Sequence, residues 1–229
     1  MEAIVLAGGF GTRLREVVPD VPKPMAPIAG RPFLEILLSA LSCKGFKRVV
    51  LSLGFMADKI SSHFGAQFAG MDLSYVVEER PLGTGGAVRL SLSHCHQDHV
   101  YIFNGDTFLD LDIGALEQHW QLHQLPIIVG RMVVDTARYG RLLVAEGRVQ
   151  GFNEKGQAGP GLINAGCYVL GRNQLDSFPL NTQFSLEADY LASAVTIQPF
   201  DLFSSDGQFI DIGIPEDFKL AQSLLAGIL

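Results

Sequence analysis

The sequence lacks the features that mark secreted, cysteine-rich and membrane-spanning proteins. It has only three cysteines and no CxxC spacing, so neither a disulfide framework nor a cysteine zinc site is expected. No apolar run approaches the ~20 residues that crossing a bilayer requires, and no basic segment precedes the first apolar stretch. These absences predict a cytoplasmic protein with reduced thiols and no membrane partner.

Positive charge is also scarce. The 17 Lys and Arg residues are outnumbered by 24 Asp and Glu residues, which gives a formal net charge of −7. Because binding to a nucleic-acid backbone requires clustered Lys and Arg, no nucleic-acid partner is expected. Only 18% of the residues are charged and 48% are hydrophobic, a composition that excludes disorder. The length of 229 residues predicts a single domain that spans residues 1–229.

The sequence does contain a regular alternation of strand and helix patterns. Short apolar runs predict strands, and longer runs with helical spacing predict helices. The expected strands are 3–7, 48–53, 73–77, 100–103 and 126–134, and the expected helices are 33–43, 57–64, 85–93 and 113–123. Such alternation is typical of an α/β fold with a Rossmann-like, mostly parallel sheet flanked by helices.

The pattern changes after about Val134. Short apolar runs at 142–145, 149–152 and 163–170 have little helix between them and predict a small antiparallel addition. Two further helices are expected near 186–194 and 216–225. The apolar residues 200–203 fit either the edge of the core or an oligomer contact, and both alternatives stay open.

A glycine-rich turn, GGFGTR, follows the first expected strand. Gly8, Gly9 and Gly11 have no Cβ, so a polyphosphate can approach their backbone N–H groups closely. Thr12 and Arg13 add a hydroxyl donor and a fixed cation. The dinucleotide pattern GxGxxG is incomplete, which disfavours a dinucleotide fold. A purely structural tight turn remains an alternative for these residues alone.

Lys23 lies between two prolines, which fix the chain and limit the movement of an ammonium group that could bind phosphate. The stretch GGFGTRLREVVPDVPKPMAPIAGRP closely resembles the signature of the sugar-1-phosphate nucleotidyltransferases, or NDP-sugar pyrophosphorylases. The resemblance continues through LGTGGA, NGD, FNEK, NAGCYVL, FSLEAD and DIGIPED, and so covers nearly the whole chain. It implies an enzyme that joins a nucleoside triphosphate to a sugar 1-phosphate and releases pyrophosphate.

The resemblance also implies roles for individual residues. Arg13 would hold the β- and γ-phosphates, Lys23 would stabilise charge on the attacked α-phosphate, and Asp106 would complete the catalytic set. Such catalysis relies mainly on positioning and electrostatics. The implied nucleotide-binding residues are Leu6, Ala7, Gly8, Gly9, Gly11, Thr12, Arg13, Glu78, Gly83 and Thr84.

Two aspartates, Asp106 and Asp211, each end an apolar run. Asp106 follows an expected strand, at the edge of the sheet where open α/β folds bind ligands. The family pattern makes this pair the ligands of Mg²⁺, which leaves the other coordination positions for phosphate oxygens and water. Taken alone, each aspartate could instead cap a turn or a helix. Asp110 and Asp112 are expected to start the following helix.

Base selection is expected in the loop Glu78-Glu79-Arg80-Pro81-Leu82-Gly83-Thr84. Guanine presents adjacent N1–H and N2–H donors, and one carboxylate can accept both. In relatives that use thymidine or uridine triphosphates, a glutamine commonly stands where Glu78 aligns. The acidic pair therefore favours GTP, although a solvated loop charge stays open for Glu78 or Glu79.

The resemblance places five further residues around the sugar phosphate. They are Gly140, Glu154, Lys155, Asn164 and Glu187. The short chain, with no hexapeptide repeat, most resembles the branch that guanylylates D-glycero-α-D-manno-heptose 1-phosphate for surface polysaccharides. Transfer to mannose 1-phosphate, uridylyl or thymidylyl transfer to a hexose 1-phosphate, and a catalytically inactive sugar-nucleotide-binding subunit are the alternatives. The resemblance is also compatible with a homodimer of this protein.

Two groups of histidines lie outside these motifs. His94, His96 and His99 surround Cys95 in a metal-like spacing, but they lie in a connector far from every motif, so no zinc site is expected there. His119 and His123 lie on an amphipathic helical pattern and are expected to pack or to face solvent.

Overall fold

The computed structural model describes residues 1–9, 11, 14, 17–153, 156 and 158–228. Ten strands of this part of the chain form one sheet, in the order β10-β11-β13-β9-β12-β7-β1-β4-β6-β5. Its strands are β1 (Glu2–Leu6), β4 (Arg48–Leu53), β5 (Gln67–Phe68), β6 (Met71–Val77), β7 (His99–Asn104), β9 (Ile127–Val133), β10 (Leu142–Ala145), β11 (Arg148–Phe152), β12 (Gly161–Gly171) and β13 (Asp201–Ser204).

Two small sheets lie beside the large one. β8 (Thr107–Leu109) pairs with β14 (Phe209–Asp211), and β2 (Pro27–Ile28) pairs with β3 (Arg31–Pro32). The helices are α1 (Phe33–Cys43), α2 (Ala57–Phe64), α3 (Gly83–Leu92), α4 (Ile113–His123), α5 (Ala192–Ile197) and α6 (Pro215–Leu224). No helix of the described chain has both the length and the apolar character that crossing a membrane requires.

The centre of the large sheet is parallel. β7, β1, β4 and β6 lie side by side in parallel register, and Ala3, Ile4 and Val5 of β1 are fully buried. An uninterrupted apolar run is what a strand covered on both faces requires. β12 runs antiparallel between β7 and β9 and so joins the second half of the chain to this centre. The predicted fold class, a mostly parallel sheet flanked by helices with a small antiparallel addition, is confirmed.

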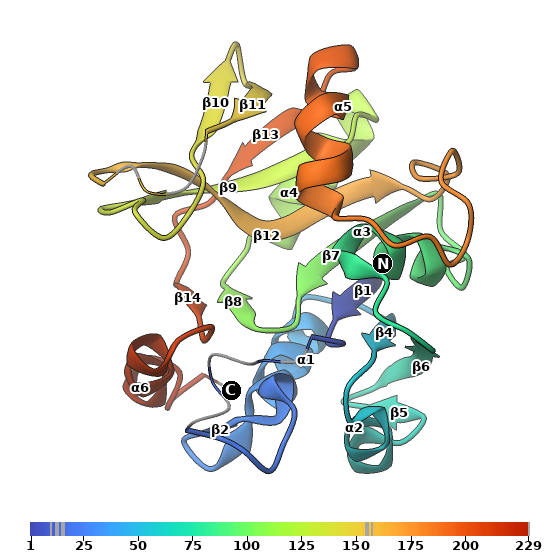
Figure 1. Ribbon diagram of the computed structural model, residues 1–229, viewed down its shortest axis with the longest axis vertical. Helices are drawn as coiled ribbons and strands as arrows, with labels where there is room; N and C mark the ends of the chain where they lie inside the picture. Colours follow the sequence, from blue (N-terminus) through green and yellow to red (C-terminus); the bar gives the residue numbers. More distant parts are fainter. Residues whose placement is uncertain (10, 12–13, 15–16, 154–155, 157, 229) are drawn as a thin grey trace.

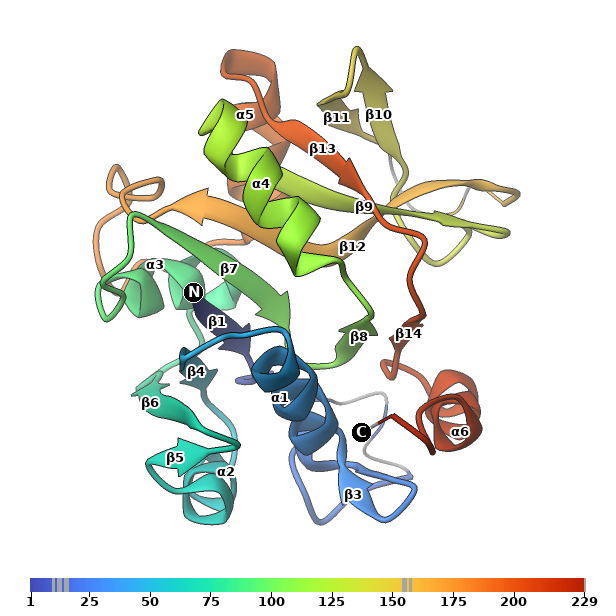
Figure 2. The same cartoon turned by 180° about the vertical axis from the view of Figure 1, so that it is seen from behind.

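Helices cover both faces of the sheet (Figures 1 and 2). On one face, α1, α2 and α4 pack around buried side chains such as Leu38 and Leu116. On the other face, α3 and the helical segment 186–197 pack around Val88 and Leu191. A third cluster, which includes Phe33, joins the outer side of α1 to α6 and β14.

The structure decides between open alternatives for some elements and differs from the sequence prediction for others. Residues 200–203 belong to the core, because Phe200 is fully buried and β13 is inserted between β11 and β9. The predicted helix 186–194 is a π-helical turn, Leu186–Leu191, that continues through α5 to Ile197. The pairing of β8 with β14 was not predicted. Asp112 does cap α4, since its side chain accepts from the Ala115 amide, whereas Asp110 pairs with Lys44.

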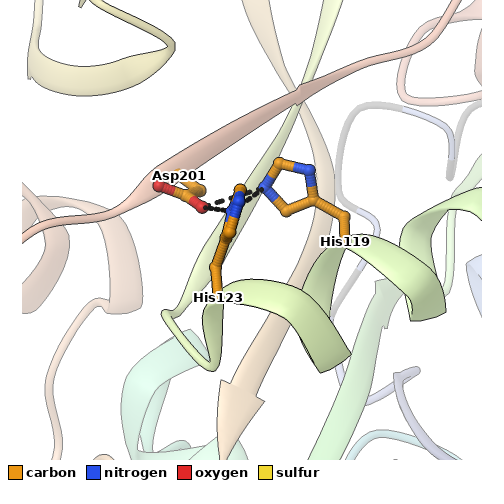
Figure 3. Close-up of side chains that lie close together, drawn as sticks. All are labelled: His119, His123 and Asp201. Atoms are coloured by element: carbon orange, nitrogen blue, oxygen red, sulfur yellow. Dashed lines mark hydrogen bonds and ion pairs between the residues drawn. The ribbon is translucent and has the colours of Figure 1, made fainter.

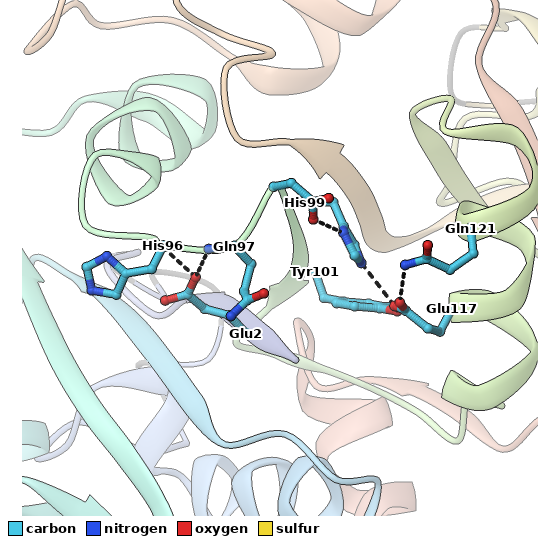
Figure 4. A network of polar contacts seen from close by, with 8 residues as sticks. Glu2, His96, Gln97, His99, Tyr101, Glu117 and Gln121 are labelled. Atoms are coloured by element: carbon cyan, nitrogen blue, oxygen red, sulfur yellow. Dashed lines mark hydrogen bonds and ion pairs between the residues drawn. The ribbon is translucent and has the colours of Figure 1, made fainter.

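Polar groups are buried at the amino ends of β1 and β7 (Figure 4). The Glu2 carboxylate accepts from the backbone amides of His96 at 2.7 Å and Gln97 at 3.1 Å, and it pairs with Arg48. Nearby, the imidazole of His99 lies between Asp98 and Glu117. Within the histidine-rich connector, the His96 amide and the His99 ring therefore both have partners that tie the connector to the fold.

Candidate active site

The candidate site lies at the carboxyl ends of the central parallel strands. The register pairs Leu6 of β1 with Ser52 of β4 and with Asn104 of β7. Residues that follow these strands therefore meet at one edge of the sheet, as ligand-binding residues do in open α/β folds. A cavity of about 510 Å³ lies here. Its lining includes Leu6, Ala7, Gly8, Gly9, Lys23, Ser52, Gly54, Glu78, Glu79, Gly83, Thr84, Asn104 and Asp106.

The glycine-rich turn lies in close backbone contact with its neighbours. A Cβ at Gly8 would stand 3.0 Å from Glu78 Oε1 and 3.1 Å from the Gly54 nitrogen. Gly11 has a φ of +59°, and a Cβ there would stand 2.8 Å from the Cβ of Lys23. Glycine is therefore required for the turn to lie against both Lys23 and the edge of the sheet.

Lys23 and Asp106 line this cavity, and a second carboxylate, Asp211, lies beside them. The Nζ of Lys23 donates to Asp106 Oδ2 at 2.5 Å and lies 4.0 Å from Asp211 Oδ1. The β8–β14 pairing produces this arrangement, because it aligns Asp211 with Thr107, and the Ile212 amide donates to the Asp106 carbonyl at 2.9 Å. Burial, and then the negative charge of Asp106, raise the pKa of Asp211. The site thus concentrates negative charge that only Lys23 offsets in direct contact among the described residues.

Glu78 is anchored at the same edge by the backbone. Its amide donates to the Leu53 carbonyl at 2.8 Å, and its Oε2 accepts from the Leu82 amide at 2.7 Å. Burial raises the pKa of Glu78, and the Leu82 amide opposes this rise. Both residues line the cavity, but Glu79 is exposed, as a solvated loop charge would be, whereas Glu78 is half-buried.

The start of α3 connects the cavity to the segment that carries Glu187. Gly83 has a φ of +70°, and a Cβ there would stand 2.5 Å from the Phe184 carbonyl oxygen. The Thr84 hydroxyl accepts from the Leu186 amide at 2.9 Å. Two of the predicted nucleotide-binding residues are therefore held directly against residues 184–187.

Asn164 and Glu187 are brought together beside the cavity. The Asn164 amide donates to Glu187 Oε1 at 3.0 Å, and the Tyr168 hydroxyl donates to the same oxygen at 3.0 Å. The Gly166 amide donates to Asn164 Oδ1, and a Cβ at Gly166 would stand 2.4 Å from the side chain of Asn104, which lines the cavity. Glu187 is exposed, as expected for a residue at the start of a helix, but its carboxylate also accepts hydrogen bonds from Asn164 and Tyr168.

The protein-family model described as "Nucleotidyl transferase" matches residues 2–225, nearly the whole chain. The chain belongs to this family. It is 38% identical over 226 residues to the D-glycero-alpha-D-manno-heptose 1-phosphate guanylyltransferase of Aneurinibacillus thermoaerophilus, with 98% of each chain covered. Against the enzyme of the same name from Campylobacter jejuni the identity is 38% over 220 residues, covering 95% of this chain and 97% of that one.

A solved structure is also closely similar. HddC from Yersinia pseudotuberculosis, complexed with GMP-PN, matches with a TM-score of 0.87 and 36% identity, over 97% of this chain and 98% of that chain. The fold, the sequence and the family model therefore agree that this protein is a nucleotidyltransferase.

Not every predicted site residue of this nucleotidyltransferase lies in the described chain. Thr12, Arg13, Glu154 and Lys155 fall outside it. Gly140 is described, and it lies against the backbone of residue 153, where a Cβ would stand 2.9 Å from the Asn153 carbonyl oxygen.

The site of the nucleotidyltransferase contains polar residues that sequence reasoning missed. Arg138 pairs with Asp217 at 2.5 Å, and its positive charge opposes the rise that burial and Asp106 cause in the pKa of Asp211. Ser52 lines the cavity, and its buried hydroxyl has no hydrogen-bond partner among the described residues. Ser52 is the one hydroxyl residue in the apolar strand RVVLSL, and this could have marked it as a candidate site residue. No such pattern surrounds Arg138.

Proposed function

We propose that the protein transfers GMP from GTP to D-glycero-α-D-manno-heptose 1-phosphate in the presence of Mg²⁺, forming a GDP-sugar and pyrophosphate. The observation that carries this proposal is the meeting of Lys23, Asp106 and Asp211 at a cavity on the carboxyl edge of the sheet. The relatives at 38% identity, whose names carry the heptose activity, support the choice of sugar. We place the reaction in the cytoplasm, as a step in surface polysaccharide synthesis.

Mg²⁺ fits the pair formed by Asp106 and Asp211. This ion is usually bound by one or two carboxylates, with phosphate oxygens and water in the remaining positions. The raised pKa of Asp211 reflects burial and repulsion from Asp106, and a divalent cation relieves repulsion of this kind. When bound, Mg²⁺ supplies positive charge that stabilises the phosphate oxygens of the transition state.

The proposed reaction is a single displacement at the α-phosphorus. An oxygen of the sugar phosphate forms the new P–O bond, while the bond from the α-phosphorus to the bridging oxygen breaks and pyrophosphate leaves with its electron pair. Lys23 stabilises the charge that develops on the α-phosphate, and Arg13 holds the β- and γ-phosphates. The backbone N–H groups of the turn from Gly8 to Gly11 hold the nucleotide. No side chain has to form a covalent intermediate.

Base and sugar are recognised by two different groups of residues in this proposal. Glu78 accepts from guanine N1–H and N2–H, beside Gly83 and Thr84, and the Ser52 hydroxyl offers a further hydrogen bond. Asn164 and Glu187, already within hydrogen-bond distance of each other, bind sugar hydroxyls. Gly140, Glu154 and Lys155 complete this wall, with Lys155 as a point charge for the sugar phosphate.

A matrix of nucleoside triphosphates and sugar 1-phosphates tests the proposal. Pyrophosphate release is measured with GTP, UTP, TTP or CTP against the 1-phosphates of D-glycero-α-D-manno-heptose, mannose and glucose, always with Mg²⁺. We expect the highest kcat/KM for GTP with the heptose 1-phosphate. Preference for mannose 1-phosphate would replace the sugar assignment, and the absence of pyrophosphate in every combination would leave a sugar-nucleotide-binding subunit.

A further inference from the structure

A second group of candidate metal ligands lies outside the cavity. His119 and His123 of α4 and Asp201 of β13 place one ligand atom each within 4.8 Å of one another. Figure 3 shows both imidazoles projecting from α4 toward the carboxylate. We propose that these three residues bind one divalent transition-metal ion of the zinc type, which joins α4 to β13.

The proposed zinc site lies at the amino-terminal ends of the strands, whereas the cavity lies beyond their carboxyl-terminal ends. Asp201 begins β13 and is in register with Ile127, the first residue of β9. β12 aligns Ile127 with Val169, and Val169 in turn with Tyr101 in the amino-terminal half of β7. The cavity, in contrast, lies beyond the carboxyl end of β7, where Asp106 is found. The three residues are therefore separate from the proposed Mg²⁺ ligands.

The geometry matches an open three-ligand site. His119 Nε2 lies 2.9 Å and His123 Nδ1 lies 2.6 Å from the same oxygen of Asp201, and the two ring nitrogens are 3.1 Å apart. Tetrahedral zinc with bonds of 2.0–2.2 Å places its ligand atoms about 3.4 Å from one another. The three pairs of atoms therefore have to move apart by about 0.3 to 0.8 Å to admit the ion, which rotation of the imidazoles can supply.

The helix spacing favours this arrangement. Histidines four positions apart on one helix project from the same face, as they do in the zinc-binding H-E-x-x-H pattern. The side chains of His119 and His123 are 26% and 47% exposed, so water can reach the fourth coordination position. Three protein ligands and one water form the usual open zinc site.

The chemistry of the three ligands selects the metal. Imidazole nitrogens favour zinc, copper and nickel, whereas Mg²⁺ and Ca²⁺ favour oxygen ligands. Asp201 is only 5% exposed, so its negative charge requires a nearby cation or strong donors. Its other oxygen lies 3.6 Å from Arg148 Nε, which orients the carboxylate in the manner of an outer-shell partner. Without a metal, the same groups would form only a hydrogen-bonded contact between α4 and β13.

Zinc titration of the chelator-treated full chain distinguishes a metal site from a contact that is only hydrogen-bonded. The titration is performed in excess Mg²⁺, which occupies oxygen-rich sites and competes poorly for imidazole. We expect the wild-type protein to bind one equivalent of Zn²⁺ and to unfold at a higher temperature when Zn²⁺ is present. The His123→Ala variant removes the most exposed ligand and should bind Zn²⁺ at least roughly tenfold more weakly, without the thermal shift.

Two further variants complete the test. His96→Ala removes an exposed histidine from the connector and should bind Zn²⁺ as the wild type does. Asp201→Asn preserves the shape of the side chain but removes its charge, and it should also weaken binding. With Co²⁺ as probe, the intense absorption of a four-coordinate ion should appear in the wild type and disappear in His123→Ala. Equal Zn²⁺ binding by wild type and His123→Ala, or no binding by either, would overturn the proposal.

Discussion

The two carboxylate oxygens of Glu78 have different surroundings. Its Oε2 accepts from the Leu82 amide, whereas its Oε1 faces the glycine turn, 3.0 Å from the position that a Cβ of Gly8 would occupy. The sequence predicted the role of this residue from the chemistry of guanine, and the structure adds the backbone contacts that hold the side chain in place.

Replacing Glu78 with Gln tests the proposed base choice. An amide keeps the shape of the side chain, but it loses the charge that strengthens hydrogen bonds from guanine N1–H and N2–H. Hydrogen bonds to charged groups contribute about 1.5–3 kcal/mol, so we expect the kcat/KM ratio of GTP to UTP to fall by roughly 10- to 100-fold. Glu146→Gln, at an exposed turn that does not line the cavity, serves as the control and should retain the wild-type ratio. An unchanged ratio in Glu78→Gln would refute the role of Glu78.

The remaining site residues differ in how well the sequence predicted them. Lys23 and Asp106 stand in motifs whose residue types already indicate phosphate and metal binding. Ser52 and Arg138 could not be predicted in this way, because their importance comes from neighbours in other strands and loops. The hydroxyl of Ser52 is of interest because β4 places it at the cavity wall, where it is buried without a hydrogen-bond partner among the described residues.

At the scale of elements, the alternating strand and helix patterns predicted most of the central sheet, including β1, β4, β7 and β9. The short strands were harder to predict from the sequence. β8 and β14 have three residues each and are distant in the sequence, so neither shows a periodicity of its own. Their pairing nevertheless places Asp211 beside Asp106. The motifs therefore pointed to the two aspartates that come together, whereas the pairing that brings them together was not predicted; their binding of Mg²⁺ stays a prediction.

The amino end of β1 supports a prediction about stability. Burial raises the pKa of Glu2, but the hydrogen bonds from the His96 and Gln97 amides, together with Arg48, outweigh it, so the pKa of Glu2 is lower in the folded protein than its usual value of 4.5. The unfolded chain therefore takes up the proton first as the pH falls. The stabilisation from Glu2 is complete above pH 4.5 and is lost as the pH falls below that value toward the folded pKa.

Comparison of Glu2→Gln with the wild type measures this effect. We expect the wild type to have the larger free energy of unfolding above pH 4.5 and the difference to shrink in more acidic buffer. Urea denaturation at a series of pH values gives the free energy of unfolding of each protein, and so the difference between them at each pH. Glu146→Gln, at an exposed turn, should show no such pH-dependent difference. A difference between Glu2→Gln and the wild type that is constant with pH would contradict the proposed protonation behaviour of Glu2.

For the whole molecule, the two edges of the sheet have different properties. The carboxyl edge carries the cavity with its acidic pair and Lys23. The amino edge carries the buried network around Glu2 and His99 and the proposed zinc ligands (Figures 3 and 4). The proposed active site and the buried polar network thus lie at opposite ends of the strands. The motifs follow strands and so pointed to the carboxyl ends, where the cavity is found, whereas His119, His123 and Asp201 come together only through the packing of α4 beside β13.

The most direct test of the central claim is pyrophosphate release from GTP and D-glycero-α-D-manno-heptose 1-phosphate with Mg²⁺, compared between the wild type and Lys23→Ala. Removing one electrostatic donor of a transition state typically lowers kcat by about 100- to 1000-fold, and we expect a loss of this size with the circular dichroism spectrum unchanged. The exposed variant His96→Ala should retain wild-type activity. Release by Lys23→Ala at the wild-type rate would contradict the account, because Lys23 is the cation that contacts the acidic pair among the residues that the structure describes.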